Sequence, residues 1–314
     1  MRRDALAVFF RRAVIAALPL AGACISGGTC DVPGSVDVVV DGGFSDGDVT
    51  AVDTMGGITF TQAGRCSAFC PPGHVSCEPS VQNGQSLVHC NGGRCLGRAP
   101  ANLRAARAPS GGDAIGRELA IAAHLEAASV SAFERLRDEL RAHGAPPSLI
   151  RAAERARKDE VRHARMTAAL AKRHGAAPPP VELCGDLPQV RELESIAVEN
   201  AVEGCARESW GALIATWQSR TAGDPRLRAL AESIAPDETR HAELAWAVAR
   251  WAEPRLSAAA RRRVRDARRR ALAELAAAAA VEPAPILVER LGLPRARPAL
   301  ALARALADEA ARRA

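Results

Sequence analysis

The sequence predicts a mainly α protein: a four-helix bundle with a long crossover, preceded by a small disulfide-stapled β module and followed by extra helices. Three observations support this prediction. Residues 113–253 contain four segments in which apolar side chains recur with the period of an α-helix, separated by glycine and proline. Six of the nine cysteines lie between residue 30 and residue 100, among turn-forming residues. Of the 314 residues 48% are hydrophobic, enough for a folded protein with a substantial core.

The first 24 residues resemble an export signal. Four arginines precede an apolar stretch at residues 13–23, which is too short to span a bilayer, and Cys24 follows at once. The sequence fits two kinds of processing, either ordinary cleavage after Ala23 or lipid attachment at Cys24 after an off-register lipobox. We therefore expect an exported protein that is periplasmic or anchored to the membrane through a lipidated Cys24.

The next segments predict a linker and a β module. Residues 25–56 carry six aspartates and no basic residue between Asp31 and Asp53, which indicates a flexible acidic linker with room for one strand at 36–40. Residues 57–98 alternate turn residues with short β-prone runs, as in a small Cys-rich β module.

The cysteines other than Cys24 are disulfide candidates in an oxidising compartment. They are Cys30, Cys66, Cys70, Cys77, Cys90, Cys95, Cys184 and Cys205. Their connectivity does not follow from the sequence, although we slightly prefer a Cys184–Cys205 pair over Cys205 as a small buried thiol. A zinc site within the β module is the weaker alternative, because its cysteine spacings are irregular.

The helices follow from caps and breakers. Asp113 is expected to cap a first helix that ends near Gly144, and a second runs from Pro147 to Gly175. Residues 176–185 contain three consecutive prolines, so they cannot be helical and are long enough for a crossover. The remaining predicted helices run from a cap at Asp186 to Gly223, from Asp224-Pro225 to Pro254, and over 255–281 and 296–313 in the Arg/Ala-rich segment 254–314.

The motif DExRHA occurs twice, at residues 159–164 and 237–242, 78 residues apart. A glutamate and a histidine three residues apart lie on one side of a helix, so both can reach one ion. Glu126 precedes the first motif glutamate by 34 residues, and Glu203 precedes the second by 35. The helical region is therefore an internal repeat of two helix pairs.

The motif residues lie within apolar stripes. A carboxylate in a core costs several kcal/mol unless it is paired or bound to metal. Carboxylates with one imidazole per ion suit Fe, Mn or Zn. The predicted ligands are Glu126, Glu160, His163, Glu203, Glu238 and His241. Glu199 and Glu208 are alternatives to Glu203, but only Glu203 preserves the repeat spacing. A single ExxH motif is more often part of a solvent-exposed helix face than a metal site. Two such motifs, each with a glutamate at a similar distance upstream, favour a metal site.

Two further features accompany the motif. We interpret Asp159 and Asp237 mainly as exposed helix-surface charges, with orientation of the ligands as the alternative. Pro236 removes a helix hydrogen bond two residues before Glu238, so we expect it to kink the fourth helix.

Over residues 113–253 the sequence resembles the ferritin-like superfamily of two-metal carboxylate proteins, most closely exported bacterial ferritin-like domain proteins. The order Glu, ExxH, Glu, ExxH carries the resemblance. It implies a left-handed four-helix bundle in which Glu126, Glu160 and His163 hold one metal. Glu203, Glu238 and His241 would hold the other, with Glu160 and Glu238 as bridges.

The resemblance also implies two ions, iron before manganese or zinc, and redox chemistry of Fe(II) with oxygen or peroxide. The reaction could be of the ferroxidase, peroxidase or oxygenase type, since fold does not choose a reaction. Whether the protein is an enzyme stays open, and the alternative is a non-catalytic metal-binding or structural envelope protein. Tyrosine is absent from the sequence, which excludes a tyrosyl radical.

The net charge is +6, and residues 261–270 form a basic run on a predicted helix. A solvated face is the favoured interpretation, followed by contact with membrane phosphates. No nucleic-acid partner is expected for an exported protein, and the oligomeric state does not follow from the sequence.

Overall fold

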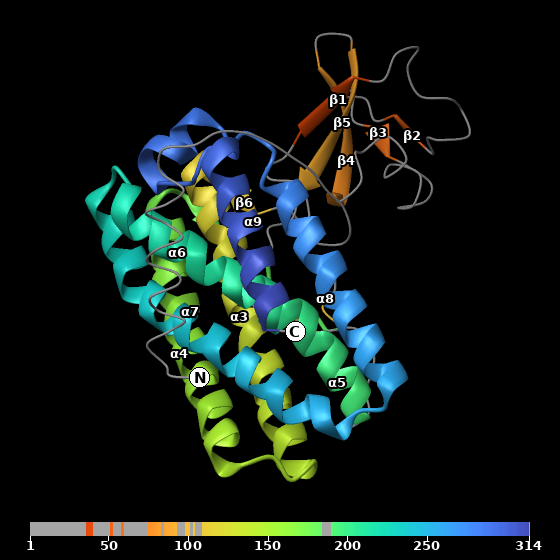
Figure 1. Ribbon diagram of the computed structural model, residues 1–314. Coiled ribbons are helices and arrows are strands. Elements are labelled where there is room, and N and C mark those ends of the chain that lie inside the picture. Colours follow the sequence, from red (N-terminus) through yellow and green to blue (C-terminus); the bar gives the residue numbers. More distant parts are fainter. Residues whose placement is uncertain are drawn as a thin grey trace.

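The computed structural model describes residues 36–39, 51–52, 58–59, 74–82, 85–92, 98–100, 103, 109–183 and 190–313. The described chain is mainly helical, as the sequence predicts (Figure 1). The predicted signal segment with Cys24 lies outside the described residues, as do Cys30, Cys66, Cys70, Cys95 and Cys184. Within the described part, no helix is long and apolar enough to cross a membrane.

The strands before residue 98 form two small antiparallel sheets. β1 (Val36–Val39), β5 (Gln85–Gly92) and β4 (His74–Gln82) make a sheet in the order β1-β5-β4, and β2 (Ala51–Val52) pairs with β3 (Ile58–Thr59). β1 comes from the predicted linker, so the β structure begins before residue 57. The register sets Cys77 opposite Cys90, and both remain disulfide candidates.

The first helix pair begins and ends near the predicted residues. α3 (Ala114–Ala142) starts after Asp113, whose side chain accepts a hydrogen bond of 2.7 Å from the Gly116 backbone N–H. α4 (Pro147–Arg173) starts with a proline in its first turn, where no helix hydrogen bond is lost. Between them Gly144 has a φ of 67°, which favours glycine, and the chain reverses into an antiparallel hairpin.

The crossover after α4 is held against the chain that enters the helices. β7 (Ala176–Ala177) pairs with β6 (Ser110–Gly111), and Leu183 forms an isolated β-bridge with Leu103. The buried His124 donates from Nδ1 to the Pro179 carbonyl at 3.1 Å. The described part of the proline-rich segment, residues 176–183, is therefore not helical, as predicted.

The third helical segment differs from its prediction in two ways. It begins at Leu193, and the predicted cap Asp186 lies outside the described residues. Just before the helix, Arg191 binds Glu139 through both its backbone N–H and its guanidinium. The segment is also not a regular α-helix throughout. It consists of α5 (Leu193–Glu199), the π-helix η1 (Asn200–Glu208) and α6 (Ser209–Thr221).

The fourth helix, α7 (Pro225–Ala252), begins after the N-cap Asp224, as predicted. It continues through Pro236 without interruption, so the proline does not end the helix. A short 3₁₀ turn, η2 (Glu253–Arg255), follows it.

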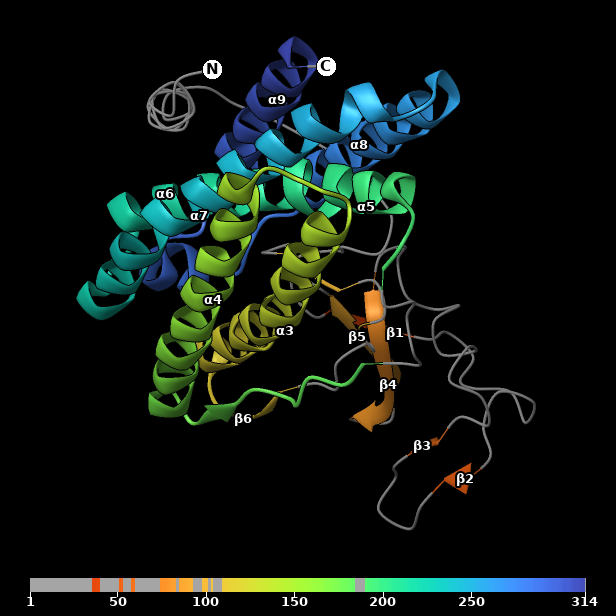
Figure 2. The same ribbon diagram turned by 90° about the horizontal axis from the view of Figure 1, so that it is seen from below.

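The C-terminal segment packs on the outside of the third and fourth helical segments. It contains α8 (Ala258–Ala278), a short π-helix η3 (Leu287–Leu291) and α9 (Ala296–Arg312). α8 contacts η1, and α9 contacts α6. Figure 2 shows α5, α6 and α7 between the α3–α4 pair and the outer helices α8 and α9. The third segment is consequently buried on nearly all sides, with Asn200, Cys205, Ala206, Glu208, Ala212 and Leu213 fully enclosed.

Candidate metal centre

Six acidic and histidine side chains from all four inner helical segments converge in the interior. They form two groups in which the potential ligand atoms all lie within 4.8 Å of one another. The first group is Glu126, Glu160, His163 and Glu238; the second is Glu160, Glu208 and His241. All are buried except Glu126, whose side chain is 19% exposed. The structure therefore contains buried acidic and histidine groups that can hold metal ions.

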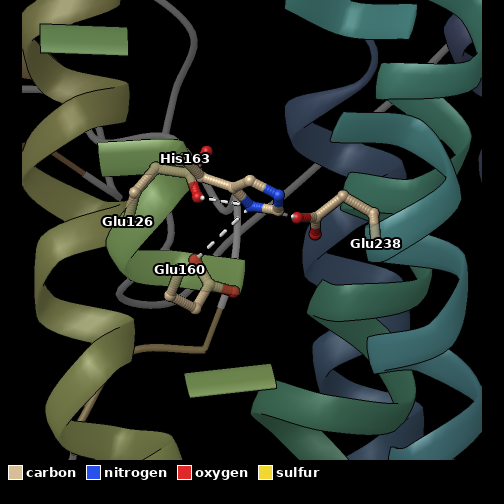
Figure 3. Close-up of side chains that lie close together, drawn as sticks. All are labelled: Glu126, Glu160, His163 and Glu238. Carbon is tan, nitrogen blue, oxygen red and sulfur yellow. Dashed lines mark ion pairs between the residues drawn. The ribbon is translucent and has the colours of Figure 1, made fainter. Parts of the chain in front are cut away.

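His163 is the hub of the first group (Figure 3). Its Nδ1 lies 3.4 Å from Glu126 Oε2, 3.2 Å from Glu238 Oε1 and 3.9 Å from Glu160 Oε2. Three carboxylates from three different helices thus face one ring nitrogen. This is the arrangement that the ExxH spacing on α4 predicts, with Glu126 supplied by α3.

His241 is the hub of the second group. Its Nδ1 lies 3.1 Å from Glu160 Oε1, 3.7 Å from Glu208 Oε2 and 3.7 Å from Glu238 Oε1. The two imidazole centroids are 5.9 Å apart. Because Glu160 and Glu238 each approach both histidines, these two carboxylates occupy the positions between the groups.

Glu203, a predicted ligand, lies in neither group. Its Oε1 accepts a hydrogen bond of 2.5 Å from Arg207 Nη1, and its Oε2 accepts from the Ala99 backbone N–H at 3.2 Å. Arg207 also lies 3.9 Å from Glu274 on α8, so Glu203 faces the outer helices. The acidic side chain that the third segment contributes to the two groups is Glu208, which is fully buried.

The prediction of Glu203 failed because the two helix hairpins differ in length. α3 continues for 16 residues beyond Glu126, whereas α6 ends 13 residues beyond Glu208, and the connection 222–224 is one residue shorter than 143–146. The repeat spacing is therefore not conserved between the halves. Burial of the third segment on all sides also removes the single apolar stripe that would have identified its inward face. Glu208 is an alternative to Glu203 in the sequence, but no pattern of neighbouring residues distinguishes Glu208 from Glu203 or Glu199 as the inward-facing glutamate.

The motif aspartates cross between the helices. Asp237 Oδ2 lies 3.1 Å from His163 Nε2, and Asp159 Oδ2 lies 3.5 Å from His241 Nε2. Both aspartates are buried, and each forms ion pairs with both Arg162 and Arg240. The interpretation as surface charge was wrong: each motif places its aspartate beside the histidine of the other motif, and Asp237 accepts a hydrogen bond from His163.

The hydrogen bond to Asp237 fixes the tautomer of the His163 ring. An Nε2 that donates its proton to a carboxylate leaves Nδ1, which faces the glutamates, with the lone pair that a metal requires. The two positive charges of Arg162 and Arg240 balance the two negative charges of Asp159 and Asp237. These four residues therefore add no net charge to the centre.

The interior of the centre contains many polar atoms without hydrogen bonds. Among the described residues, both carboxylate oxygens of Glu160 and Glu208, Oε1 of Glu238, and Nδ1 of His163 and His241 are buried and make none. Buried polar atoms without partners cost about 1–3 kcal/mol each, more if charged. Seven such donor atoms around one volume fit a pair of cations.

Without cations, protons neutralise the cluster. Burial and the neighbouring charges of Glu126 and Glu238 raise the pKa of Glu160 well above its usual range. Burial and then Glu238 raise the pKa of Glu208 to about 8. Burial disfavours the charged form of His163, but its contacts with Glu126 and Glu238 outweigh burial and raise its pKa to about 10.

Cys205 is a free, buried thiol in the structure, so the preferred disulfide with Cys184 is wrong. Its Sγ donates to the Ala245 carbonyl at 3.7 Å, and burial raises the pKa of the thiol to about 11. The alternative, a small buried thiol, describes it.

Arg98 is an interior residue that the sequence did not indicate. It lies in the segment before the helices, yet only 1% of it is exposed. Its Nη2 donates to Asn200 Oδ1 at 2.6 Å, and its guanidinium lies 5.5 Å from the centroid of the Phe133 ring. Phe133 in turn packs against His241, with centroids 5.1 Å apart. The entering chain thus supports the back of the centre.

Two cavities reach the centre from different directions. One of about 90 Å³ lies between α3, α6 and α7, has mostly apolar walls, and touches Glu126 and Glu238. The other, of about 370 Å³, lies between α4 and α7 and touches Asp159 and His241.

No protein-family model, curated protein or solved structure matches the chain.

Proposed function

We propose that the chain is a ferritin-like two-metal protein of the cell envelope that carries out redox chemistry of Fe(II) with dioxygen or peroxide. One observation supports this more than any other: buried carboxylate and imidazole atoms from four helical segments face a common volume without hydrogen-bond partners. The envelope location rests on the basic and apolar first 24 residues.

In this proposal each residue has one task. Glu126 with His163, and Glu208 with His241, would hold one ion each, and Glu160 and Glu238, which approach both histidines, would serve both ions. The four negative charges of these carboxylates would balance the four positive charges of two divalent cations. Bound cations would therefore offset the repulsion between carboxylates that are buried close together. Asp237 accepts the Nε2 proton of His163 and so holds that ring in the tautomer that presents Nδ1, while Asp159 lies 3.5 Å from His241 Nε2. Two bound ferrous ions would supply two electrons to dioxygen or peroxide.

The apolar cavity supports a small oxidant. Leu119, Ile214 and Leu227 line it, and it ends at Glu126 and Glu238. A volume of about 90 Å³ admits a diatomic molecule or peroxide but not a large compound. Manganese and zinc also accept this donor set, so the metal is a matter for measurement.

The alternative is a non-catalytic metal-binding or structural envelope protein. The near-complete burial of five of the six side chains favours it, because a structural site excludes solvent.

Metal content and turnover together test the proposal. Native protein should contain about two equivalents of Fe, Mn or Zn, and anaerobic Fe(II) loading followed by oxygen or peroxide should consume the oxidant faster than free iron does. Glu160→Ala should remove both properties. Metal content below one equivalent would refute the two-metal centre. Two bound ions without oxidant consumption would favour the non-catalytic alternative.

A further inference from the structure

The larger cavity joins the centre to the surface between α4 and α7. Its volume of about 370 Å³ is in the range of small-molecule binding sites. Asp159 and His241, both buried, form its inner end, whereas Arg155 and Arg250 are exposed and lie at its mouth. A compound in this cavity would contact the ring of a proposed metal ligand.

The cavity carries excess positive charge. Four arginines line it, against the two carboxylates of Asp159 and Glu243. Arg240 is paired with Asp159, and Arg313 with Glu309. Within the described part of the chain, Arg155 and Arg250 form no ion pair or hydrogen bond. Two guanidinium groups at one mouth are thus free to bind an anion.

The walls between these ends are apolar. Leu149 and Leu244 line the cavity, together with Trp246. The Trp246 ring lies 5.2 Å from the Arg268 guanidinium and 5.4 Å from that of Arg313, and its Nε1 donates to Ser209 Oγ at 3.1 Å. The ring is therefore fixed and offers a preformed apolar surface.

The inner end offers a polar contact. His241 Nε2 is buried and has no hydrogen-bond partner of good geometry, since its distance to Asp159 is 3.5 Å. The corresponding contact of His163 with Asp237 is shorter, at 3.1 Å, and that ring does not line the cavity. The two halves of the centre therefore differ on the side where the cavity reaches it.

We propose that this cavity binds an organic anion, with an apolar body against Leu149, Leu244 and Trp246 and a carboxylate or phosphate group at Arg155 and Arg250. The end of the anion opposite its charged group lies beside His241. This deepens the proposed function by naming the class of compound that its site takes. The role of the anion as a compound taken by the metal centre rests on the proposed function, whereas the binding of the anion in the cavity does not.

Binding of simple amphiphiles to the full-length, metal-free chain tests the inference. Isothermal titration calorimetry at low salt would compare octanoate, octyl phosphate and neutral octanol. We expect both anions to bind and octanol to bind at least about tenfold more weakly, because the guanidinium contacts require a charge. The tighter anion identifies a carboxylate or a phosphate ester as the natural head group. Affinity should fall with added salt, since the arginines are exposed.

The decisive variant is Arg155→Gln/Arg250→Gln. Both side chains are exposed, so their replacement should leave the thermal unfolding midpoint unchanged, and we expect affinity to fall about tenfold. Arg262→Gln/Arg270→Gln on α8 is the matched control, because it removes the same charge from exposed arginines elsewhere, and its affinity should equal that of the wild type. Absence of binding at millimolar anion, equal binding of octanol, or equal loss in both variants would overturn the inference. Oxidant consumption measured separately keeps this result distinct from failure of the redox proposal.

Discussion

Replacing Glu208 with glutamine separates the candidate ligand that lies in the buried cluster from the one that the repeat spacing predicts. Glu208→Gln keeps the shape of the side chain and removes its charge, and Glu203→Gln is the matched change five residues earlier. In the structure Glu208 is fully buried beside His241, whereas Glu203 binds Arg207 and the Ala99 backbone. We expect metal content to fall from two equivalents to about one in Glu208→Gln only.

The same pair of variants has opposite effects on the stability of the metal-free protein. The pKa of Glu208 rises from its ordinary 4.5 to about 8 on folding, through burial and the charge of Glu238. Below pH 4.5 this carboxyl is protonated in both the folded and the unfolded protein, so it costs no stability. As the pH rises from 4.5 to 8 it ionises only in the unfolded protein, which progressively lowers the free energy of unfolding. Each pH unit in this window costs about 1.4 kcal/mol, so Glu208 costs on the order of 3 kcal/mol at pH 7. Glu208→Gln should recover that amount.

Urea unfolding in the presence of a chelator, at pH 5 and pH 7, would measure these differences. The gain in Glu208→Gln should be small at pH 5 and approach about 3 kcal/mol at pH 7. Glu203→Gln should instead lose about 1–3 kcal/mol at both values, because it breaks a mostly buried ion pair. Two metal equivalents in Glu208→Gln, or a stability gain that does not grow with pH, would refute the placement of Glu208 in the centre.

Three further predictions follow from single contacts. Asp237→Asn should weaken metal binding about 10–100-fold, measured by competition with a chromophoric chelator, because His163 loses its orienting carboxylate. Gly204→Ala should destabilise the protein by about 1–3 kcal/mol, since a Cβ there would lie 2.6 Å from Arg98 Nη2; Arg98→Ala should lessen the penalty in a double-mutant cycle of urea unfolding. Arg191→Met should cost about 3–5 kcal/mol in the same assay, because it leaves the fully buried Glu139 with too few partners.

Each of these has an outcome that would contradict it. Unchanged metal affinity in Asp237→Asn would show that the crossed aspartates only neutralise the arginines. Additive effects in the cycle between Gly204 and Arg98 would show that the two do not meet. A neutral Arg191→Met would mean that Glu139 finds other partners or a proton.

The sequence by itself determined the helix boundaries that depend on neighbouring residues. Asp113 and Asp224 cap their helices because a short carboxylate side chain reaches N–H groups two or three residues ahead. Three consecutive prolines after α4 exclude a helix there. The pairing of Glu160 with His163, and of Glu238 with His241, follows likewise from helical spacing alone.

Tertiary structure decided the features that depend on distant segments. Whether Glu203 or Glu208 faces inward depends on hairpin length, on the π-helix and on α8, which buries the outer side of the third segment. The aspartates looked like surface charge because their histidine partners lie on the opposite motif, 74 residues away for Asp237 and His163.

Arg98 shows the same limit most clearly. It stands in an irregular segment, and its burial depends on Asn200 and on the space that Gly204 leaves, more than 100 residues later. Local patterns report the propensities of adjacent residues, whereas the identity of a ligand depends on which packed surface each helix presents, and that is settled only when all the helices have packed.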